Sequence, residues 1–395
     1  MRRAPVLGHR DFRLILVAWG LSALGDFMAV TALTLRVEEQ TNSGFAVAGL
    51  LFASALPLVL FNPVAGWLVD RFETRRVLAL SALVQAAAVG ALAGWDGLAL
   101  TYALVFVLNC GLAVERPALF ALIPRIVGEE QAPKAYAWFE SVRYATLTLG
   151  LLLGGVVTGA FGASTALLVD AGTFLVTAVV ATALRTRRAA RPDGAAGGTE
   201  ERRMTAGLRL VGRNRLLRTM VIVLAGSILF GGIDNVANVF LAKDALGIGD
   251  AGYGALAAAW GVGMIAGAVV AGRRVRRRNA AVLVVGAVAL MGGAILATAP
   301  APVVWTALAT LMIGGVGNGL SNVAMRVVLQ TRVAETLRGR VYAAYQGLLS
   351  VAEFAALAIA GALVQLLGAR WTLALAGGGC LLVGLYGLPA VRRRA

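Results

Sequence analysis

Long apolar runs alternate with short charged clusters along the whole chain. Each run has about 20 residues, which is the length of α-helix that crosses a hydrocarbon core of about 30 Å. A helix also satisfies its own backbone hydrogen bonds in lipid, where no water is present to do so. The pattern therefore predicts an all-α integral membrane protein. The twelve predicted transmembrane helices cover residues 12–36, 45–69, 77–95, 98–122, 137–161, 163–184, 217–241, 251–271, 279–299, 303–329, 343–367 and 370–391.

Composition agrees with this prediction. Of the 395 residues, 59% are hydrophobic and 14% are charged, and the mean hydropathy is +0.80. A soluble domain usually has about 25% charged residues, and so apolar a chain lacks the polar surface to cover a soluble particle. The formal net charge of +16 fits either a nucleic-acid-binding protein or a membrane protein with cationic loops. The distribution of the charge decides between these two classes.

The basic residues gather in alternate loops. All but six of the 36 Lys and Arg residues lie at the two termini or in the loops that a twelve-helix topology places on the same side as the termini. Basic loops mark the cytoplasmic side of a membrane protein. We therefore expect a multi-pass protein of the cytoplasmic (inner) membrane with both termini in the cytoplasm, and no nucleic-acid partner. The six exceptions are Arg36, Lys243 and Arg370 in the opposite loops, and Arg116, Arg143 and Arg326 within predicted helices.

The predicted helices form two halves. Residues 1–184 and 217–395 each contain six helices, and residues 185–216 form a polar linker that ends in a basic amphipathic stretch. Leu24-Gly25-Asp26 in the first helix is echoed by Gly232-Ile233-Asp234 in the seventh. Two pseudo-symmetric six-helix bundles joined by a long central loop form the parallel-repeat plan of many secondary transporters.

The loop after the second predicted helix carries a distinctive motif. Gly66, Asp70, Arg71, Arg75 and Arg76 are spaced as Gly-x-x-x-Asp-Arg-x-x-x-Arg-Arg, which resembles the loop 2–3 signature of the major facilitator superfamily. A small residue permits close helix approach. In that family the loop locks the cytoplasmic gate in the outward-open state, so the resemblance implies a gate role for these residues. A solvated basic loop is the alternative interpretation.

Further segments resemble one branch of that superfamily. They are Arg116-Pro117-Ala118, Asp170 to Leu175, and Arg338-Gly339-Arg340-Val341, and they are similar to the enterobactin-exporter-like branch. This branch is also described as the third drug:proton antiporter group, and it includes macrolide efflux proteins. The resemblance implies the twelve-helix major facilitator fold and transport of a small molecule.

Two positions differ from the antiporter pattern. The fifth predicted helix has Gly150-Leu151-Leu152-Leu153-Gly154-Gly155, which keeps the glycines of the family's antiporter motif but lacks its proline. The fourth helix has Asn109 and Gly111 in the region where many proton antiporters carry an arginine.

Four carboxylates within predicted helices are candidates for proton coupling: Asp26, Glu115, Asp234 and Glu353. A charged residue at the centre of a membrane helix costs about 2.5 kcal/mol or more, so such residues are functional candidates. A low dielectric favours the neutral form of a carboxyl group, which can then bind a proton in one conformation and release it in another. The resemblance places Asp26, Glu115 and Asp234 on cavity-lining helices.

Structural roles are the alternative for these acidic residues. Glu115 could pair with Arg116, and Asp234 could bond Asn238 one turn further along its helix. We expect a capping or packing role for Asp170, which lies in the outer part of the sixth helix.

An amphipathic substrate requires a mostly apolar cavity with few polar anchors. The candidate cavity residues, each of which could instead serve only in packing, are Trp19, Phe27, Asn109, Phe230, Asn235 and Asn238.

Several kinds of chemistry are excluded. His9 is the only histidine, and it lies in the predicted cytoplasmic N-terminus, so we expect no buried histidine relay, no Ser-His-Asp triad and no histidine metal site. Gly315-x-Gly317-x-Gly319 lies in a membrane span and indicates close helix packing, and no nucleotide-binding Gly-x-x-x-x-Gly-Lys-[Ser/Thr] occurs. We therefore expect a protein that is not an enzyme, has no cofactor or metal, and uses the proton gradient for energy.

The sequence thus predicts a monomeric secondary transporter in contact with membrane lipids. It would export a small amphipathic drug, natural product or siderophore by alternating access, in exchange for protons. A lysophospholipid flippase or a solute importer of the same fold is an alternative. A membrane scaffold or sensor that transports nothing is an alternative of a different class, although it would not need deep carboxylates.

Overall fold

The computed structural model describes residues 6–186, 209, 211–212, 214–333 and 335–392. Within these residues the chain is helical and contains no β-strand. The α-helices are α1 (Arg10–Thr41), α2 (Gly44–Leu60), α3 (Asn62–Arg71), α4 (Thr74–Gly94), α5 (Leu98–Val127), α6 (Ala132–Phe161), α7 (Ala163–Ala183), α9 (Arg215–Gly231), α10 (Asp234–Phe240), α11 (Gly249–Arg274), α12 (Ala280–Thr298), α13 (Val304–Arg332) and α14 (Glu335–Arg392). A 3₁₀-helix, η1 (Val6–Gly8), precedes α1, and a π-helix, η2 (Leu241–Ala245), follows α10.

The helices have the lengths that membrane spans require. In the described part of the chain, ten helical segments are long and apolar enough to cross a membrane. The longest, α14, leaves the helical conformation at Gly368, where φ is 75°, so it contains the last two predicted helices. The second predicted helix corresponds to α2 followed by α3. The prediction of an all-α protein with twelve membrane-spanning helices is therefore confirmed.

The seventh predicted helix, over 217–241, corresponds to one membrane-length span, Arg215–Ala245, which contains a short break in its regular α-helical pattern. α9 ends at Gly231 and α10 begins at Asp234 and continues as η2, while Gly232 and Ile233 keep right-handed helical backbone angles. Two consecutive glycines have the lowest helix propensity of any residue except proline. A Cβ at Gly232 would lie 2.6 Å from the carbonyl oxygen of Ile228 and 3.1 Å from Cβ of Ala356 on α14, so a larger side chain would also crowd the neighbouring helix.

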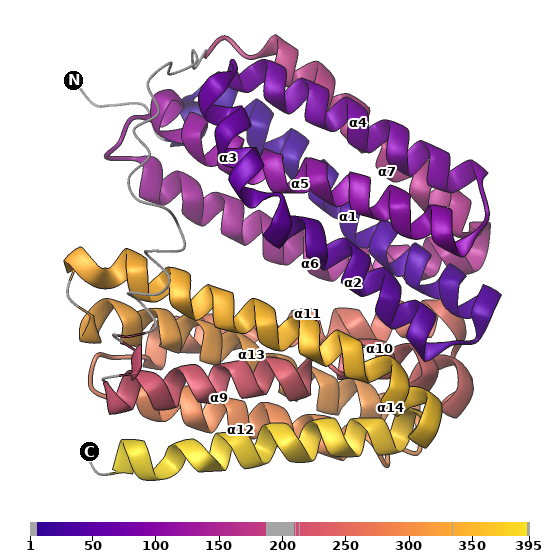
Figure 1. Cartoon of the computed structure of the whole chain (residues 1–395), viewed down its shortest axis with the longest axis vertical. Coiled ribbons are helices and arrows are strands. Elements are labelled where there is room, and N and C mark those ends of the chain that lie inside the picture. The colour runs from indigo at the N-terminus through magenta and orange to yellow at the C-terminus, as the bar shows by residue number, and fades with distance from the viewer. Residues whose placement is uncertain (1–5, 187–208, 210, 213, 334, 393–395) are drawn as a thin grey trace. The chain divides into compact units, whose positions relative to one another are not determined.

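The chain divides into two compact units. The first comprises Met1–Asn42 and Gly49–Ala195, and the second comprises Ser43–Ala48 and Ala196–Ala395. Within each unit the helices run side by side along a common direction (Figure 1). Most of the predicted linker and of its amphipathic stretch lies outside the described residues. Asn214, near the end of this segment, caps α9 by accepting hydrogen bonds from the backbone N–H groups of Leu216 and Leu217.

Glycines bring α11 and α13 into backbone contact in the second unit. A Cβ at Gly263 or Gly267 would collide with backbone carbonyl oxygens of α13. A Cβ at Gly315 or Gly319 would collide with those of α11, including the carbonyl oxygen of Trp260. Small residues four positions apart on both helices allow this approach, which confirms that the glycine repeat of α13 serves helix packing.

The three basic residues in the loops opposite the termini, Arg36, Lys243 and Arg370, each have a structural partner. Arg36 donates a hydrogen bond of 2.7 Å to the carbonyl oxygen of Leu92 near the end of α4, and it also pairs with Asp96. The hydrogen bond that Arg36 donates to Asp96, together with the positive charge of Arg36, holds the pKa of Asp96 below its usual range. Because Arg36 binds both groups, it holds the C-terminal end of α1 against the C-terminal end of α4.

The other two exceptions behave in a similar way. Arg370 donates hydrogen bonds of 3.0 and 2.9 Å to the carbonyl oxygens of Ala299 and Ala301, just beyond α12. Lys243 lies 3.2 Å from Asp250 as an ion pair. A basic side chain that satisfies carbonyl groups at a helix end stabilises that end, so these residues serve the fold.

Candidate functional site

Asp26 and Asn109, predicted for different roles, line the same cavity in the first unit. Asp26 lies near the middle of α1, and Asn109 lies on α5, where its side chain donates a 2.9 Å hydrogen bond to the carbonyl oxygen of Val105. The cavity has about 40 Å³ and is otherwise lined mainly by apolar side chains of α1, α2 and α5, with Ser54 as a further polar group. A water molecule needs about 10–15 Å³ measured in this way and some polar partners. The cavity can therefore hold water next to Asp26.

The carboxyl group of Asp26 is incompletely satisfied. Its Oδ1 is buried and has no hydrogen-bond partner within the described residues. Buried polar groups usually have a partner in the protein or in ordered water. An acidic group without one, facing a cavity of water size, is chemically suited to take up and release a proton.

Glu115 lines a second cavity, of about 20 Å³, in the same unit. Its side chain is 4% exposed. Trp19 of α1 lines this cavity too, and its ring lies 4.9 Å, centroid to centroid, from that of Phe139 on α6. The structure therefore brings a predicted coupling residue and a predicted cavity residue together for a second time.

The glycines of the antiporter-like motif pack beside Asp26. A Cβ at Gly150 of α6 would lie 2.6 Å from Cβ of Phe27 and 2.8 Å from the carbonyl oxygen of Leu24. A Cβ at Gly154 would lie 2.9 Å from the carbonyl oxygen of Met28. These glycines let α6 lie directly on the segment of α1 that carries the carboxylate. The motif therefore keeps its close helix crossing without its proline.

In the second unit, Asp234 is the first residue of α10, directly after the break in the seventh span. It is 5% exposed. The side chain of Asn238 has a buried Oδ1 with no partner in the described part of the chain. Asn235 is exposed and donates a 3.2 Å hydrogen bond to the carbonyl oxygen of Gly232.

The remaining candidates of this unit lie apart from Asp234. Glu353 is exposed on α14. The ring of Phe230 covers Gly379 of α14 so closely that a Cβ there would collide with it. Among the described residues, no contact joins these side chains into one site.

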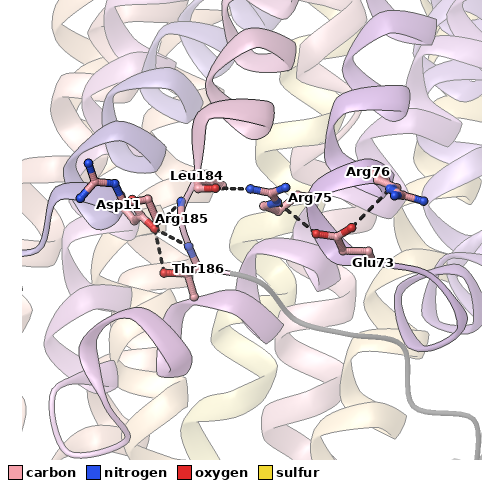
Figure 2. A network of polar contacts seen from close by, with 7 residues as sticks. All are labelled: Asp11, Glu73, Arg75, Arg76, Leu184, Arg185 and Thr186. Carbon is pink, nitrogen blue, oxygen red and sulfur yellow. Dashed lines mark hydrogen bonds and ion pairs between the residues drawn. The ribbon is translucent and has the colours of Figure 1, made fainter.

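Arg75 and Arg76, two residues of the loop motif, belong to a polar network at the end of the first unit where α1 begins. Figure 2 shows Arg75 between Glu73 and the carbonyl oxygen of Leu184, with Arg76 on the other side of Glu73. The Nε atoms of the two arginines lie 3.1 and 3.3 Å from the carboxylate oxygens of Glu73. Arg71 is exposed, and the surroundings of Gly66 and the side chain of Asp70 are not among the features that the structure describes.

Asp11 extends this network to the chain that leaves α7. Its Oδ2 accepts hydrogen bonds from the backbone N–H groups of Arg185 (3.0 Å) and Thr186 (2.7 Å), and from the hydroxyl of Thr186 (2.8 Å) (Figure 2). Sequence patterns gave no role to Asp11 or Glu73. The available signal was an acidic residue standing alone among basic ones, in a region where basic residues dominate.

Replacing Asp11 with Ala is expected to destabilise the first unit by about 2 kcal/mol. The substitution removes a charged acceptor of three hydrogen bonds from Arg185 and Thr186, and hydrogen bonds to charged groups contribute about 1.5–3 kcal/mol. Thermal unfolding of the purified protein measures the change, and hydrogen exchange at the amides of Arg185 and Thr186 locates it. Asp11→Asn keeps one acceptor oxygen and should lose less. Equal unfolding temperatures and exchange rates for Ala and wild type would show that the network contributes nothing.

An all-helical chain with twelve membrane-length spans and acidic groups buried in the middle of helices has the architecture of a multi-pass membrane transporter. The model of the Major Facilitator Superfamily matches residues 15–357 and 226–395. The chain belongs to this family, whose members are transporters and not enzymes.

Two curated relatives and one solved structure illustrate the similarity. The chain is 29% identical to the multidrug efflux pump Tap of Mycobacterium tuberculosis, over 96% of this chain and 92% of Tap. It is 27% identical to macrolide efflux protein A of Streptococcus pyogenes, over 33% of this chain and 34% of that protein. A bacterial homologue of the human lysosomal transporter Spinster, in an inward-facing and unoccupied conformation, aligns with a TM-score of 0.73 and 14% identity over 98% of both chains. This last similarity shows the fold alone.

Proposed function

We propose that this protein exports a small amphipathic molecule across the cytoplasmic membrane in exchange for protons, with alternating access of its two halves. The observation that supports proton exchange best is Asp26, whose buried oxygen has no partner in the described residues and whose cavity has room for water. The names of Tap and of macrolide efflux protein A support export of a drug-like molecule.

We propose the orientation with both termini in the cytoplasm from the charge distribution. The basic residues of the loops opposite the termini, Arg36, Lys243 and Arg370, each bind an acidic group or helix-end carbonyls. These three residues therefore have a structural role in the fold. By contrast, five arginines at and just after the end of α11 are exposed: Arg273, Arg274, Arg276, Arg277 and Arg278. An excess of solvated basic residues on one side is what sets orientation.

Everted membrane vesicles test the proposal. Vesicles that contain the protein should accumulate ethidium or erythromycin when respiration acidifies their lumen, because proton exit then drives uptake of the probe. Nigericin, which collapses the pH gradient, should abolish the accumulation, and vesicles without the protein should show none. Accumulation that nigericin leaves unchanged would refute proton exchange. Movement of lysophospholipid alone, or transport in the opposite direction, would favour a flippase or an importer.

A further inference from the structure

We infer that Asp170 of α7 belongs to the same proton-binding site as Asp26 and Glu115, so that three carboxyl groups from three helices of the first unit bind protons jointly. The inference rests on the proposed proton exchange and deepens it. It also changes the role expected for Asp170, which the sequence suggested was capping or packing.

Gly25, the residue before Asp26 on α1, leaves the space that the side chain of Asp170 occupies. A Cβ at Gly25 would collide with Oδ1 of Asp170 and would lie 2.8 Å from the hydroxyl of Thr173. Only glycine at this position lets the carboxyl group of α7 reach the backbone of α1. Since Gly25 and Asp26 are adjacent, the two aspartates enter the same region from different helices.

Asp170 has an open position for a proton. Its side chain is completely buried, at 0% exposure. The hydroxyl of Thr173 lies 3.2 Å from Oδ1, whereas the buried Oδ2 has no hydrogen-bond partner within the described residues. A carboxylate buried without donors is costly in a low dielectric, and a carboxyl oxygen that accepts nothing from the protein is free to carry a proton.

The three carboxyl groups are close enough to interact. Glu115 faces both helices that carry the aspartates, because its cavity is also lined by Ala18 of α1 and Thr177 of α7. At this range the charges of Asp170 and Glu115 act on Asp26, and the charge of Glu115 acts on Asp170. Like charges in mutual reach inside a protein do not ionise independently, and the protons they bind belong to the group and not to one residue. In the described part of the chain no set of three or more acidic, histidine or cysteine side chains is placed to hold a metal ion.

The neighbouring helices add one positive charge to this group. Arg116 of α5 interacts with Asp26 and with Glu115. The charged residues of α4, Arg75 and Arg76, lie in its first turn, in the network at the start of α1. On α6, Glu140 and Arg143 pair with each other at 3.0 Å. The sequence of α2 has no charged residue, and Asp170 is the only one in α7. Arg116 thus acts on two of the three acidic groups, an arrangement that leaves negative charge for protons to neutralise.

Infrared titration of the purified protein tests the inference without any transport assay. The protonated-carboxyl signal should have a component that disappears in Asp170→Asn, a change that keeps the size of the side chain and an oxygen for Thr173. If the site is shared, Asp26→Asn should shift the titration midpoint of the Asp170 component by at least about one pH unit, the coupling that defines interacting groups. Asp96→Asn, which changes a carboxylate outside the spans, should leave the Asp170 component unchanged.

The outcomes separate this inference from the proposed function. An Asp170 component whose midpoint is the same in wild type and in Asp26→Asn would overturn the shared site, and absence of any component lost in Asp170→Asn would do so as well. In everted vesicles, the double variant Asp26→Asn/Asp170→Asn should lose no more accumulation than the more impaired single variant, because residues of one unit are not additive. If wild type is insensitive to nigericin while the midpoints shift as expected, the shared site stands and proton exchange fails.

Discussion

Asp26→Asn is expected to reduce gradient-driven accumulation of a transported probe by at least about tenfold, because proton transfer by a positioned group contributes factors of 10² or more. Asparagine has nearly the shape of aspartate and can fill the same place in α1, but it cannot bind and release a proton. The protein should therefore remain folded and inserted. The measurement is the initial rate of ethidium uptake into everted vesicles, normalised to the amount of protein in the membrane.

Glu140→Gln is the matched control for this substitution. Glu140 lies on α6 and pairs with Arg143 on the same helix. The variant therefore removes a carboxylate that does not line the cavity of Asp26. Its uptake rate should stay close to that of wild type, since an i,i+3 pair contributes only a few tenths of a kcal/mol. If Asp26→Asn transports as fast as Glu140→Gln and remains sensitive to nigericin, Asp26 has no part in coupling.

Gly315→Val is expected to cost about 3 kcal/mol in the free energy of unfolding, the upper range for overpacking. The new Cβ would meet the carbonyl oxygen of Trp260. Backbone cannot move aside as a flexible side chain can, so α11 and α13 would have to separate. Thermal unfolding in detergent and the yield of monodisperse protein measure the effect.

Gly293→Val gives the comparison that isolates this contact. Gly293 lies within α12, and a Cβ there would have no heavy atom within 4 Å. Both variants place the same β-branched side chain in a helix, so they share any cost of propensity. Nearly equal unfolding temperatures for the two variants would mean that the close approach of α11 and α13 does not limit stability.

Much of the fold could be predicted because it depends on properties that are local along the chain. The length of each apolar run predicted the position of a span, and the alternation of basic loops predicted on which side of the membrane each loop lies. Both patterns arise because each segment is adapted to lipid or to water. The break at Gly231–Ile233 could have been suspected from two successive glycines. The close approach of Ala356 from α14 to position 232 could not, because it depends on a residue far along the chain.

The site shows the same division. A carboxylate in the middle of an apolar helix is conspicuous in any sequence, and Asp26 was found in this way. The partnership of Asp26 with Asn109 around one cavity requires the packing of α1 against α5. For Asp170 the sequence predicted a capping or packing role, from its position along its own helix. That position does not reveal that Gly25, on another helix, leaves the space for its side chain.

The contacts between α1 and α7 recur at a regular interval. Asp11, the carbonyl oxygen of Ala18, and Gly25 follow one another at seven-residue steps on α1, and they meet Thr186, Thr177 and Asp170 in turn. If one helix slid along the other by a single turn, all three contacts would break together, so we expect the two helices to move as one rigid pair. A chain break introduced after Thr186 would leave these contacts in place. A break before Leu184 would separate α7 from the residues that bind Arg75 and Asp11.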